Sequence, residues 1–95
     1  VAPLLVVLKK KDRYWTAFNP HFRALGYSKK SEEDAVKDLT ESLDVFFDVH
    51  LQRGTLDRAL LEFGWKKENN KFQPPTLGNI IPSNSRKEYL PYAMA

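Results

Sequence analysis

The sequence predicts an α+β domain in which three strands precede one long helix, in the order β-β-β-α. Two observations lead to this prediction. Residues 31–54 carry helix-capping residues at both ends and an apolar face along their length. Residues 1–30 contain three short segments rich in β-branched, aromatic and apolar residues, separated by turn-forming residues. The apolar face has the width expected of a helix that lies on a sheet, and the three segments supply that sheet.

The three strands are predicted from apolar runs and the turns between them. Residues 4–10 are β-branched and apolar, and a Lys-Asp turn at 11–12 leads into a second strand at 14–18. These two strands form a predicted hairpin. The Asn-Pro pair at 19–20 ends the second strand, and a third extended segment covers residues 22–27.

The long helix is predicted to begin after its N-cap, Ser31, and to end at the left-handed stop Gly54. Acidic residues fill its first turn and Arg53 lies near its end, as the helix dipole favours. At about 100° per residue, the side chains that share its apolar face are Val36, Leu39, Leu43, Phe46, Phe47 and His50. This face is the predicted contact with the sheet.

Shorter elements follow the long helix. Thr55 is the expected cap of a second helix that ends at Gly64. A small hairpin is predicted next, in which Trp65 and Phe72 flank a polar turn at residues 66–71 with two asparagines at its tip. We therefore divide the chain into an αβ domain at residues 1–73 and an extended tail at residues 74–95. The aromatic side chains assigned to the core are Trp15, Phe46, Phe47, Phe63, Trp65 and Phe72.

The packing of the tail is the least well predicted from the pattern of apolar and polar residues in the sequence. Its apolar residues, which are candidates for assembly, are Ile80, Ile81, Tyr89, Leu90 and Tyr92. Pro91 confines the last cluster to a sheet edge or to a bound extended arm. Two alternatives are open: the tail packs on its own domain, or it packs on a partner subunit.

Composition excludes several classes of protein. The chain has no cysteine, so it can form neither a disulfide framework nor a thiolate metal site. The apolar run at residues 1–8 is too short to cross a bilayer, and its lysines follow the run, whereas those of a secretory signal precede it. We expect a cytoplasmic protein without membrane contact.

Charge is distributed unevenly along the chain. Residues 31–48 carry seven acidic side chains and one lysine, a net charge of −6, so the remainder of this +3 chain carries +9. A basic surface for nucleic acid is one interpretation, and its candidate residues are Lys9, Lys10, Lys11, Arg13, Lys29 and Lys30. The alternative is that lysines keep strand edges soluble and discourage edge pairing.

No catalytic residue, metal ligand or cofactor is predicted. Acidic pairs at 34/38 and 44/48 have the spacing of helix neighbours, but without a third ligand they form a solvated helix face. His21 is expected in an exposed loop. His50 lies on the apolar helix face and is expected to be hydrogen-bonded and partly buried.

A set of turn, cap and core residues in the first half of the chain matches a known pattern. The residues are Tyr14, Trp15, Thr16, Ala17, Leu25, Gly26, Ser28, Ser31, Glu32, Glu33, Ala35, Asp38, Leu39, Ser42 and Leu43. This set resembles the N-terminal core of HicB-family antitoxins, and residues 54–74 are similar to those of solitary HicB-like proteins. The resemblance implies a partial ribonuclease-H-like fold, in which a three-stranded antiparallel sheet carries the long helix on one face.

The resemblance also implies a function. HicB-like proteins form dimers or larger assemblies and neutralise a small toxin that cleaves mRNA. Residues 74–95 lack the paired helical periods and the basic recognition helix of the DNA-binding module that many members carry. A nuclease activity is not expected, because the first strand contains no carboxylate that could hold a metal.

We therefore expect a non-enzymatic binding protein that acts as a homodimer or larger assembly. Its predicted partner is a small basic toxin, held on an acidic helix face that consists of Asp38, Glu41, Val45 and Asp48, or by the apolar tail. The alternative function is nucleic-acid binding through the lysine-rich surface. That alternative predicts an affinity that falls steeply with salt, because phosphate contacts release counterions.

Overall fold

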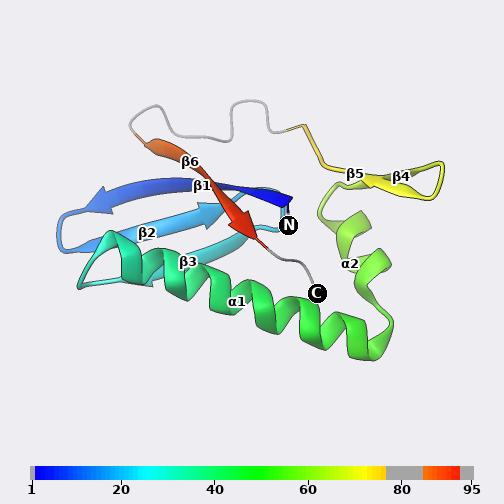
Figure 1. The fold of residues 1–95 in the computed structure, drawn as a ribbon, viewed down its shortest axis with the longest axis horizontal. Helices are drawn as coiled ribbons and strands as arrows, with labels where there is room; N and C mark the ends of the chain where they lie inside the picture. The colour runs from blue at the N-terminus through cyan, green and yellow to red at the C-terminus, as the bar shows by residue number, and fades with distance from the viewer. Residues whose placement is uncertain (1, 77–84, 93–95) are drawn as a thin grey trace.

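The computed structural model describes residues 2–76 and 85–92, and its main sheet has four antiparallel strands in the order β3-β2-β1-β6. One long helix lies along one face of this sheet (Figure 1). The elements in chain order are β1 (Ala2–Lys11), β2 (Tyr14–Asn19), β3 (Ala24–Ser28), α1 (Glu32–Arg53), α2 (Leu56–Glu62), β4 (Lys66–Glu68), β5 (Lys71–Gln73) and β6 (Arg86–Tyr92). The predicted α+β fold is confirmed.

The sheet has one strand more than the three expected, because part of the tail returns to it. Strand β6 pairs antiparallel with β1 from Ala2 opposite Tyr92 to Leu8 opposite Arg86. Pro91 lies opposite Pro3, and two residues without an N–H cannot exchange ladder hydrogen bonds, so Pro91 turns its nitrogen to the open edge. Strand β6 can therefore pair with β1, whereas its open edge lacks the N–H donor that a further strand would need at Pro91.

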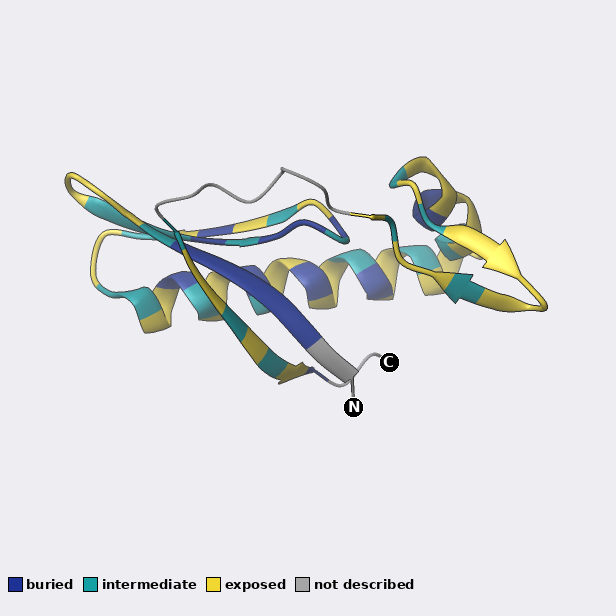
Figure 2. Ribbon diagram, turned by 90° about the horizontal axis from the view of Figure 1, so that it is seen from above, coloured by how far each residue is buried: buried dark blue, intermediate teal, exposed yellow. Residues whose placement is uncertain are grey.

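The core lies between α1 and the inner sides of the strands. Its buried side chains from the two layers include Leu4, Val6, Leu8, Ala17, Ala35, Leu39, Leu43 and Phe47. Figure 2 shows the buried residues as a continuous stretch of β1 and as a repeating stripe along α1. The predicted helix face is confirmed, and Ala35, next to Val36, is a further buried residue at its first turn.

Aromatic side chains close the end of the core near α2. Phe22 lies between Trp65, at 5.1 Å between ring centroids, and Phe47, at 5.2 Å. Of the aromatic residues assigned to the core, Phe47 is buried and the other five are half-buried. Phe22 was predicted to lie on a strand. It lies instead in the turn after β2, and its side chain is buried in this cluster.

Local signals set the ends of the elements. The Ser31 hydroxyl accepts from the Asp34 N–H at 3.1 Å, and Gly54 adopts a left-handed conformation with φ 67°, as predicted. Thr55 precedes α2 but makes no capping hydrogen bond, because its hydroxyl pairs with the His50 ring instead. At the predicted hairpin, Asn69 and Asn70 both have positive φ, which the tight turn between β4 and β5 requires.

Gly26 lies where β3 and α1 are in close contact. A Cβ atom at this position would overlap the carbonyl oxygen of Ala35 and the amide nitrogen of Leu39. Both are backbone atoms within the helix, so neither can swing aside as a flexible side chain would. Glycine is therefore required here by the spacing between the layers, although its backbone angles are ordinary for a strand.

We predict that Gly26→Ala lowers the free energy of unfolding by about 3 kcal/mol or more, because the added methyl group must push α1 away from β3. Gly54→Ala is the matched control: a Cβ there meets no atom within 4 Å, and only the left-handed backbone opposes it, at about 1 kcal/mol. Urea unfolding of both variants measures the difference. Equal losses would show that the two layers are not held at this spacing.

Candidate functional site

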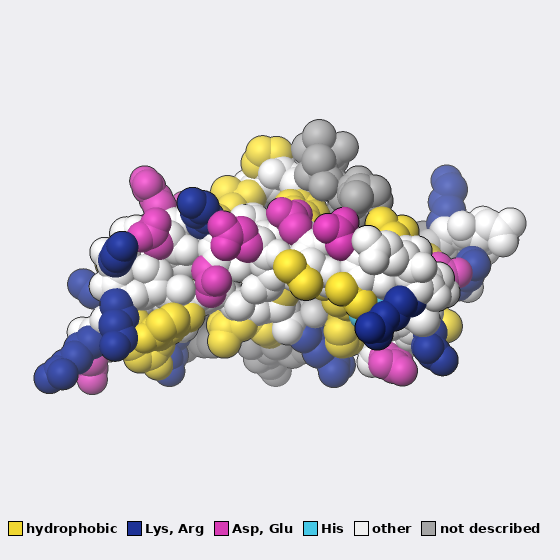
Figure 3. Space-filling model, turned by 90° about the horizontal axis from the view of Figure 1, so that it is seen from below, with side chains coloured by type: hydrophobic (Ala, Val, Ile, Leu, Met, Phe, Trp, Pro, Cys, Tyr) yellow, Lys and Arg dark blue, Asp and Glu magenta, His cyan; other side chains and the backbone are white. Residues whose placement is uncertain are grey.

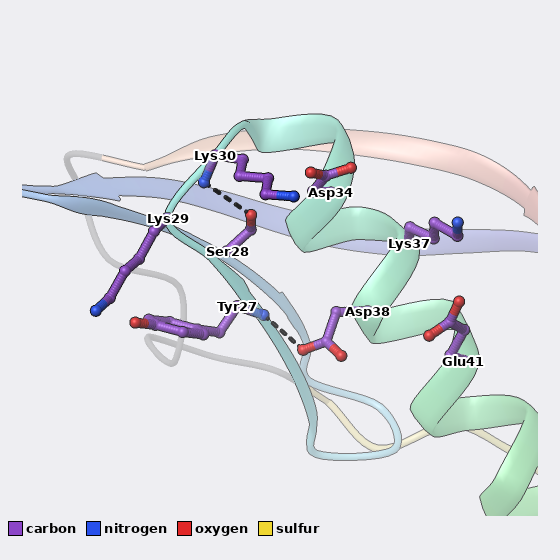
Figure 4. A pocket seen from close by; sticks show the side chains of 8 residues that line it. All are labelled: Tyr27, Ser28, Lys29, Lys30, Asp34, Lys37, Asp38 and Glu41. Atoms are coloured by element: carbon purple, nitrogen blue, oxygen red, sulfur yellow. Dashed lines mark hydrogen bonds between the residues drawn. The ribbon is translucent and has the colours of Figure 1, made fainter.

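A groove of about 500 Å³ runs between the open edge of β3 and the first half of α1 (Figure 4). We call it the β3–α1 groove, and its lining residues are Tyr27, Ser28, Lys29, Lys30, Asp34, Lys37, Asp38 and Glu41. The charge pattern of the sequence predicted a basic surface and an acidic helix face. In the folded chain Lys29 and Lys30 lie in the same groove as Asp38 and Glu41, so the two predicted surfaces meet there.

Asp38 has a structural role that its sequence position does not reveal. Its Oδ2 accepts a hydrogen bond from the Tyr27 backbone N–H at 2.9 Å. This N–H points to the helix and away from β2, so the carboxylate caps part of the open edge of β3. Arg23, with φ 53°, interrupts the extended backbone just before the strand. By antiparallel alternation, Leu25 and Tyr27 are the β3 residues whose N–H and C=O face the open edge, and the Asp38 carboxylate caps the N–H of Tyr27.

The other predicted partner-binding residues form an exposed stripe along α1. Glu41, Val45 and Asp48 follow one another at helical spacing, and the Val45 side chain is 63% exposed. Figure 3 shows a row of acidic side chains along this face with apolar side chains among them. Within residues 2–76 and 85–92, neither Glu41 nor Asp48 takes part in an ion pair.

Asp44 belongs to a different contact. Its Oδ1 accepts a hydrogen bond from the Tyr92 hydroxyl at 2.7 Å, which joins β6 to α1. Burial raises the pKa of Tyr92, and the hydrogen bond to Asp44 and the charge of Asp48 raise it further. Tyr92 is therefore a neutral donor at physiological pH, and the end of β6 is anchored in its own domain.

The tail residues proposed for assembly separate into three groups. Tyr92 is buried and Leu90 is half-buried against the core of the same chain. Tyr89 points away from the core and is 69% exposed. Ile80 and Ile81 lie outside the described residues. Among the described tail residues, Tyr89 is thus the one that offers a large exposed apolar surface.

The predicted basic residues gather at one end of the sheet. The β1–β2 turn and the loop from β3 to α1 lie at this end, because Lys10 pairs with Trp15 and Trp15 pairs with Ser28. Figure 3 shows dark blue side chains at this end, on the left. The Lys10 ammonium lies 4.9 Å from the Trp15 ring centre, and Lys9 is half-buried. The structure therefore brings together basic residues that are distant in sequence. They differ in how far their side chains are exposed and available to bind a partner.

The two histidines have structural environments. His50 is half-buried, as predicted, with its Nδ1 at 2.6 Å from the Thr55 hydroxyl and its ring 4.6 Å from that of Phe46. His21 was expected to be exposed and is half-buried, because the distant Trp65 packs beside it and donates its indole N–H to the His21 carbonyl at 2.8 Å. Burial lowers the pKa of His21.

Among residues 2–76 and 85–92, neither histidine joins a group that could hold a metal ion. In the part of the chain that the structure describes, no three histidine, cysteine, aspartate or glutamate side chains come together in such a group. None of the described helices is long and apolar enough to cross a membrane.

Comparison with known proteins adds no relative: no family model, no curated protein and no solved structure matches this chain. Two features of the site could not be recognised from the sequence. One is the capping bond from Asp38 to Tyr27, and the other is the cluster around His21. Each depends on partners brought together by the fold, whereas the exposed stripe on α1 follows from helical spacing alone.

We predict that Asp38→Ala speeds hydrogen exchange at the Tyr27 amide by about tenfold, because the N–H loses a charged acceptor. Asp38→Asn retains an acceptor oxygen and is expected to preserve most of the protection. Glu41→Ala, one helical turn away, serves as the control and is expected to leave the amide unchanged. Exchange followed by NMR at single residues checks this, and equal protection in all three variants would contradict it.

We also predict that His21 contributes to acid sensitivity. Its pKa in the folded chain lies below the ordinary value of 6.5, so the unfolded chain takes up the proton first as the pH falls. The free energy of unfolding should therefore decline below about pH 6.5 until the folded-state pKa is reached. His21→Gln should flatten this decline in urea unfolding measured between about pH 7.5 and 5.5. A decline that is as steep in the variant would contradict the assignment.

Proposed function

We propose that this chain is a non-enzymatic binding protein of the HicB-like antitoxin type, which holds a small basic protein on the exposed face of α1. The observation that carries the proposal is the stripe formed by Glu41, Val45 and Asp48, whose side chains are all exposed. Glu41 and Asp48 have no ion-pair partner among residues 2–76 and 85–92. Carboxylates without partners are available to the cations of another protein.

The composition of the stripe suits a protein partner. Exposed carboxylates steer a basic protein toward the helix and favour one orientation, while an apolar side chain at the centre supplies contact area. Val45 has that central position, and Val49, which is 37% exposed, lies one turn further along. Asp38 lies at the margin of the stripe, where its bond to Tyr27 makes it a support for the site more than a contact.

The proposed mechanism is occlusion. A small ribonuclease that cleaves mRNA needs a basic surface for the phosphates of its substrate. If that surface binds the acidic stripe, it is no longer accessible to RNA, and no chemical step by this chain is required. The proposed place of action is the cytoplasm, where mRNA would be the substrate of such a toxin.

The proposal includes a homodimer or larger assembly. A small domain buries a limited share of its surface, and a second copy would cover apolar side chains that a single chain exposes. Large exposed apolar side chains in the described parts of the chain are Leu25, Tyr27, Val45, Val49, Leu51, Leu61 and Tyr89. Two copies would also present two acidic stripes, so that two toxin molecules or one toxin dimer could be held.

The test is capture of a basic partner by charge-reversed variants. We expect Glu41→Lys with Asp48→Lys to weaken capture at least about tenfold, because two attractive contacts become repulsive. The control is Glu62→Lys with Glu68→Lys, which makes the same change in net charge at two exposed sites outside the stripe. Nuclease-treated lysate of the source cell is passed over each protein, and the retained proteins are identified by mass spectrometry.

The captured protein must then behave as a toxin. Its expression alone is expected to arrest growth and degrade mRNA, and co-expression of the unchanged chain is expected to restore growth. The variant with both stripe substitutions should fail to restore growth, while the control variant should succeed. Rescue by both variants alike would contradict a role for the stripe, and retention of no basic protein would contradict the antitoxin proposal as a whole.

A further inference from the structure

The sheet has a second face that α1 does not cover. Ala17 of β2 and Gly26 of β3 face the helix, so their neighbours along each strand face the other way. We call this side the outer sheet face. At the end near the β1–β2 turn, the residues that the register places on it are Lys9, Lys11, Tyr14, Thr16 and Tyr27.

Two tyrosines lie side by side on the outer sheet face. Tyr14 of β2 and Tyr27 of β3 have ring centroids 5.1 Å apart, with the ring planes inclined by 52°. Tyr27 is 45% exposed and Tyr14 is half-buried, so both rings belong to the surface and not to the core. Aromatic rings on adjacent strands provide flat surfaces on which unpaired bases can stack.

Lysines surround the tyrosine pair. In the register, Lys9 is opposite Thr16 and Lys11 is opposite Tyr14. Figure 4 shows that Lys29 extends to the same side as Tyr27, away from α1. Among the described residues of the four strands, those that alternation places on this face include lysines and no acidic residue. The carboxylates of α1 that come nearest are Asp34, Asp38 and Glu41, which line the β3–α1 groove beside Tyr27 and Lys29.

We infer that the outer sheet face around Tyr14 and Tyr27 binds a single strand of nucleic acid. Two successive bases stack on the tyrosine rings, and Lys9, Lys11 and Lys29 contact the phosphates on either side. A duplex is excluded from this mode of binding because its bases are already stacked and paired. Stacking and phosphate contacts do not depend on the 2′-hydroxyl, so RNA and DNA strands should bind with similar affinity.

Basic residues that are neighbours in the sequence lie on different sides of the sheet. The Lys10 ammonium is positioned over Trp15, on the side of the sheet that faces α1. In Figure 4, Lys30 extends toward α1 and not toward Tyr27. These two residues are therefore outside the proposed site, although each is adjacent in sequence to a lysine within it. Of the acidic stripe, Glu41 lines the β3–α1 groove with Tyr27 and Lys29, whereas Val45 and Asp48 lie further along α1, so the inference does not rest on the antitoxin proposal.

The first test replaces the rings. Binding of a fluorescently labelled oligouridine is measured by anisotropy in low salt, with oligothymidine and a duplex of equal length beside it. We expect Tyr14→Ala with Tyr27→Ala to weaken binding at least roughly thirtyfold, which corresponds to loss of two stacked bases. Tyr14→Phe with Tyr27→Phe retains both rings and should bind like the unchanged chain. Unchanged affinity in the alanine variant, or equally tight binding of the duplex, would overturn the inference.

The second test compares two matched lysine pairs. Lys11→Ala with Lys29→Ala should weaken binding and reduce the slope of log K against log salt by about 1.4, as expected for the loss of two phosphate contacts to a single strand. Lys10→Ala with Lys30→Ala removes the same charge at the same end of the molecule and should change the slope by much less. Equal effects of the two pairs would show general attraction without a site and would overturn the inference. Unchanged oligouridine binding by Asp48→Lys, which lies outside the β3–α1 groove, would show that the far part of the stripe acts independently, as inferred, whereas abolished binding would overturn that independence.

Discussion

The close contact between β3 and α1 is the constraint on which the rest of this structure depends. With no side chain at Gly26, the helix backbone at Ala35 and Leu39 lies directly against the strand. That spacing brings the Asp38 carboxylate to the Tyr27 N–H and so protects the open edge of β3. The same contact sets β3 beside α1 along the β3–α1 groove, in which lysines and carboxylates from separate parts of the chain meet. A larger residue at position 26 would alter the core, the edge and the groove together.

The two layers give the molecule two chemically different faces. The helix presents carboxylates and valines, while the outer sheet face presents lysines and tyrosines. Both open edges of the sheet are poor sites for a further strand. On the β6 edge, Pro91 has no N–H to donate to a further strand. On the β3 edge, the Tyr27 N–H already donates to the Asp38 carboxylate. Recognition by this domain is therefore more readily explained by side chains on its faces than by strand addition at its edges.

Local signals predicted the elements well because each depends on a few neighbouring residues. Ser31 and Gly54 marked the ends of α1, and the Asn-Asn pair marked the hairpin tip. Predictions failed or stayed open where a contact spans a long sequence distance: His21 was expected to be exposed, while a sheet edge was one of the two places predicted for the cluster at Pro91 and is the one observed. Trp65 covers the His21 region, and β6 joins a sheet whose first strand lies more than 70 residues earlier. Nothing near His21 or Arg86 in the sequence indicates these partners, since the energy of such contacts comes from burial that only the folded chain creates.

The sequence by itself determined the α+β class, the limits of α1, its buried face and the acidic stripe on its exposed face. Helical periodicity and capping are properties of adjacent residues, so they need no knowledge of the fold. Only the tertiary structure decided which charged residues are free to bind. In the folded chain, Asp44 accepts a hydrogen bond from the Tyr92 hydroxyl, and Asp38 accepts one from the Tyr27 N–H. Lys11 and Lys29 lie beside the tyrosine pair, whereas Lys10 and Lys30 face α1. The reason is physical: whether a side chain is exposed depends on which surface its strand or helix turns to the other layer, and that is set by packing between distant segments.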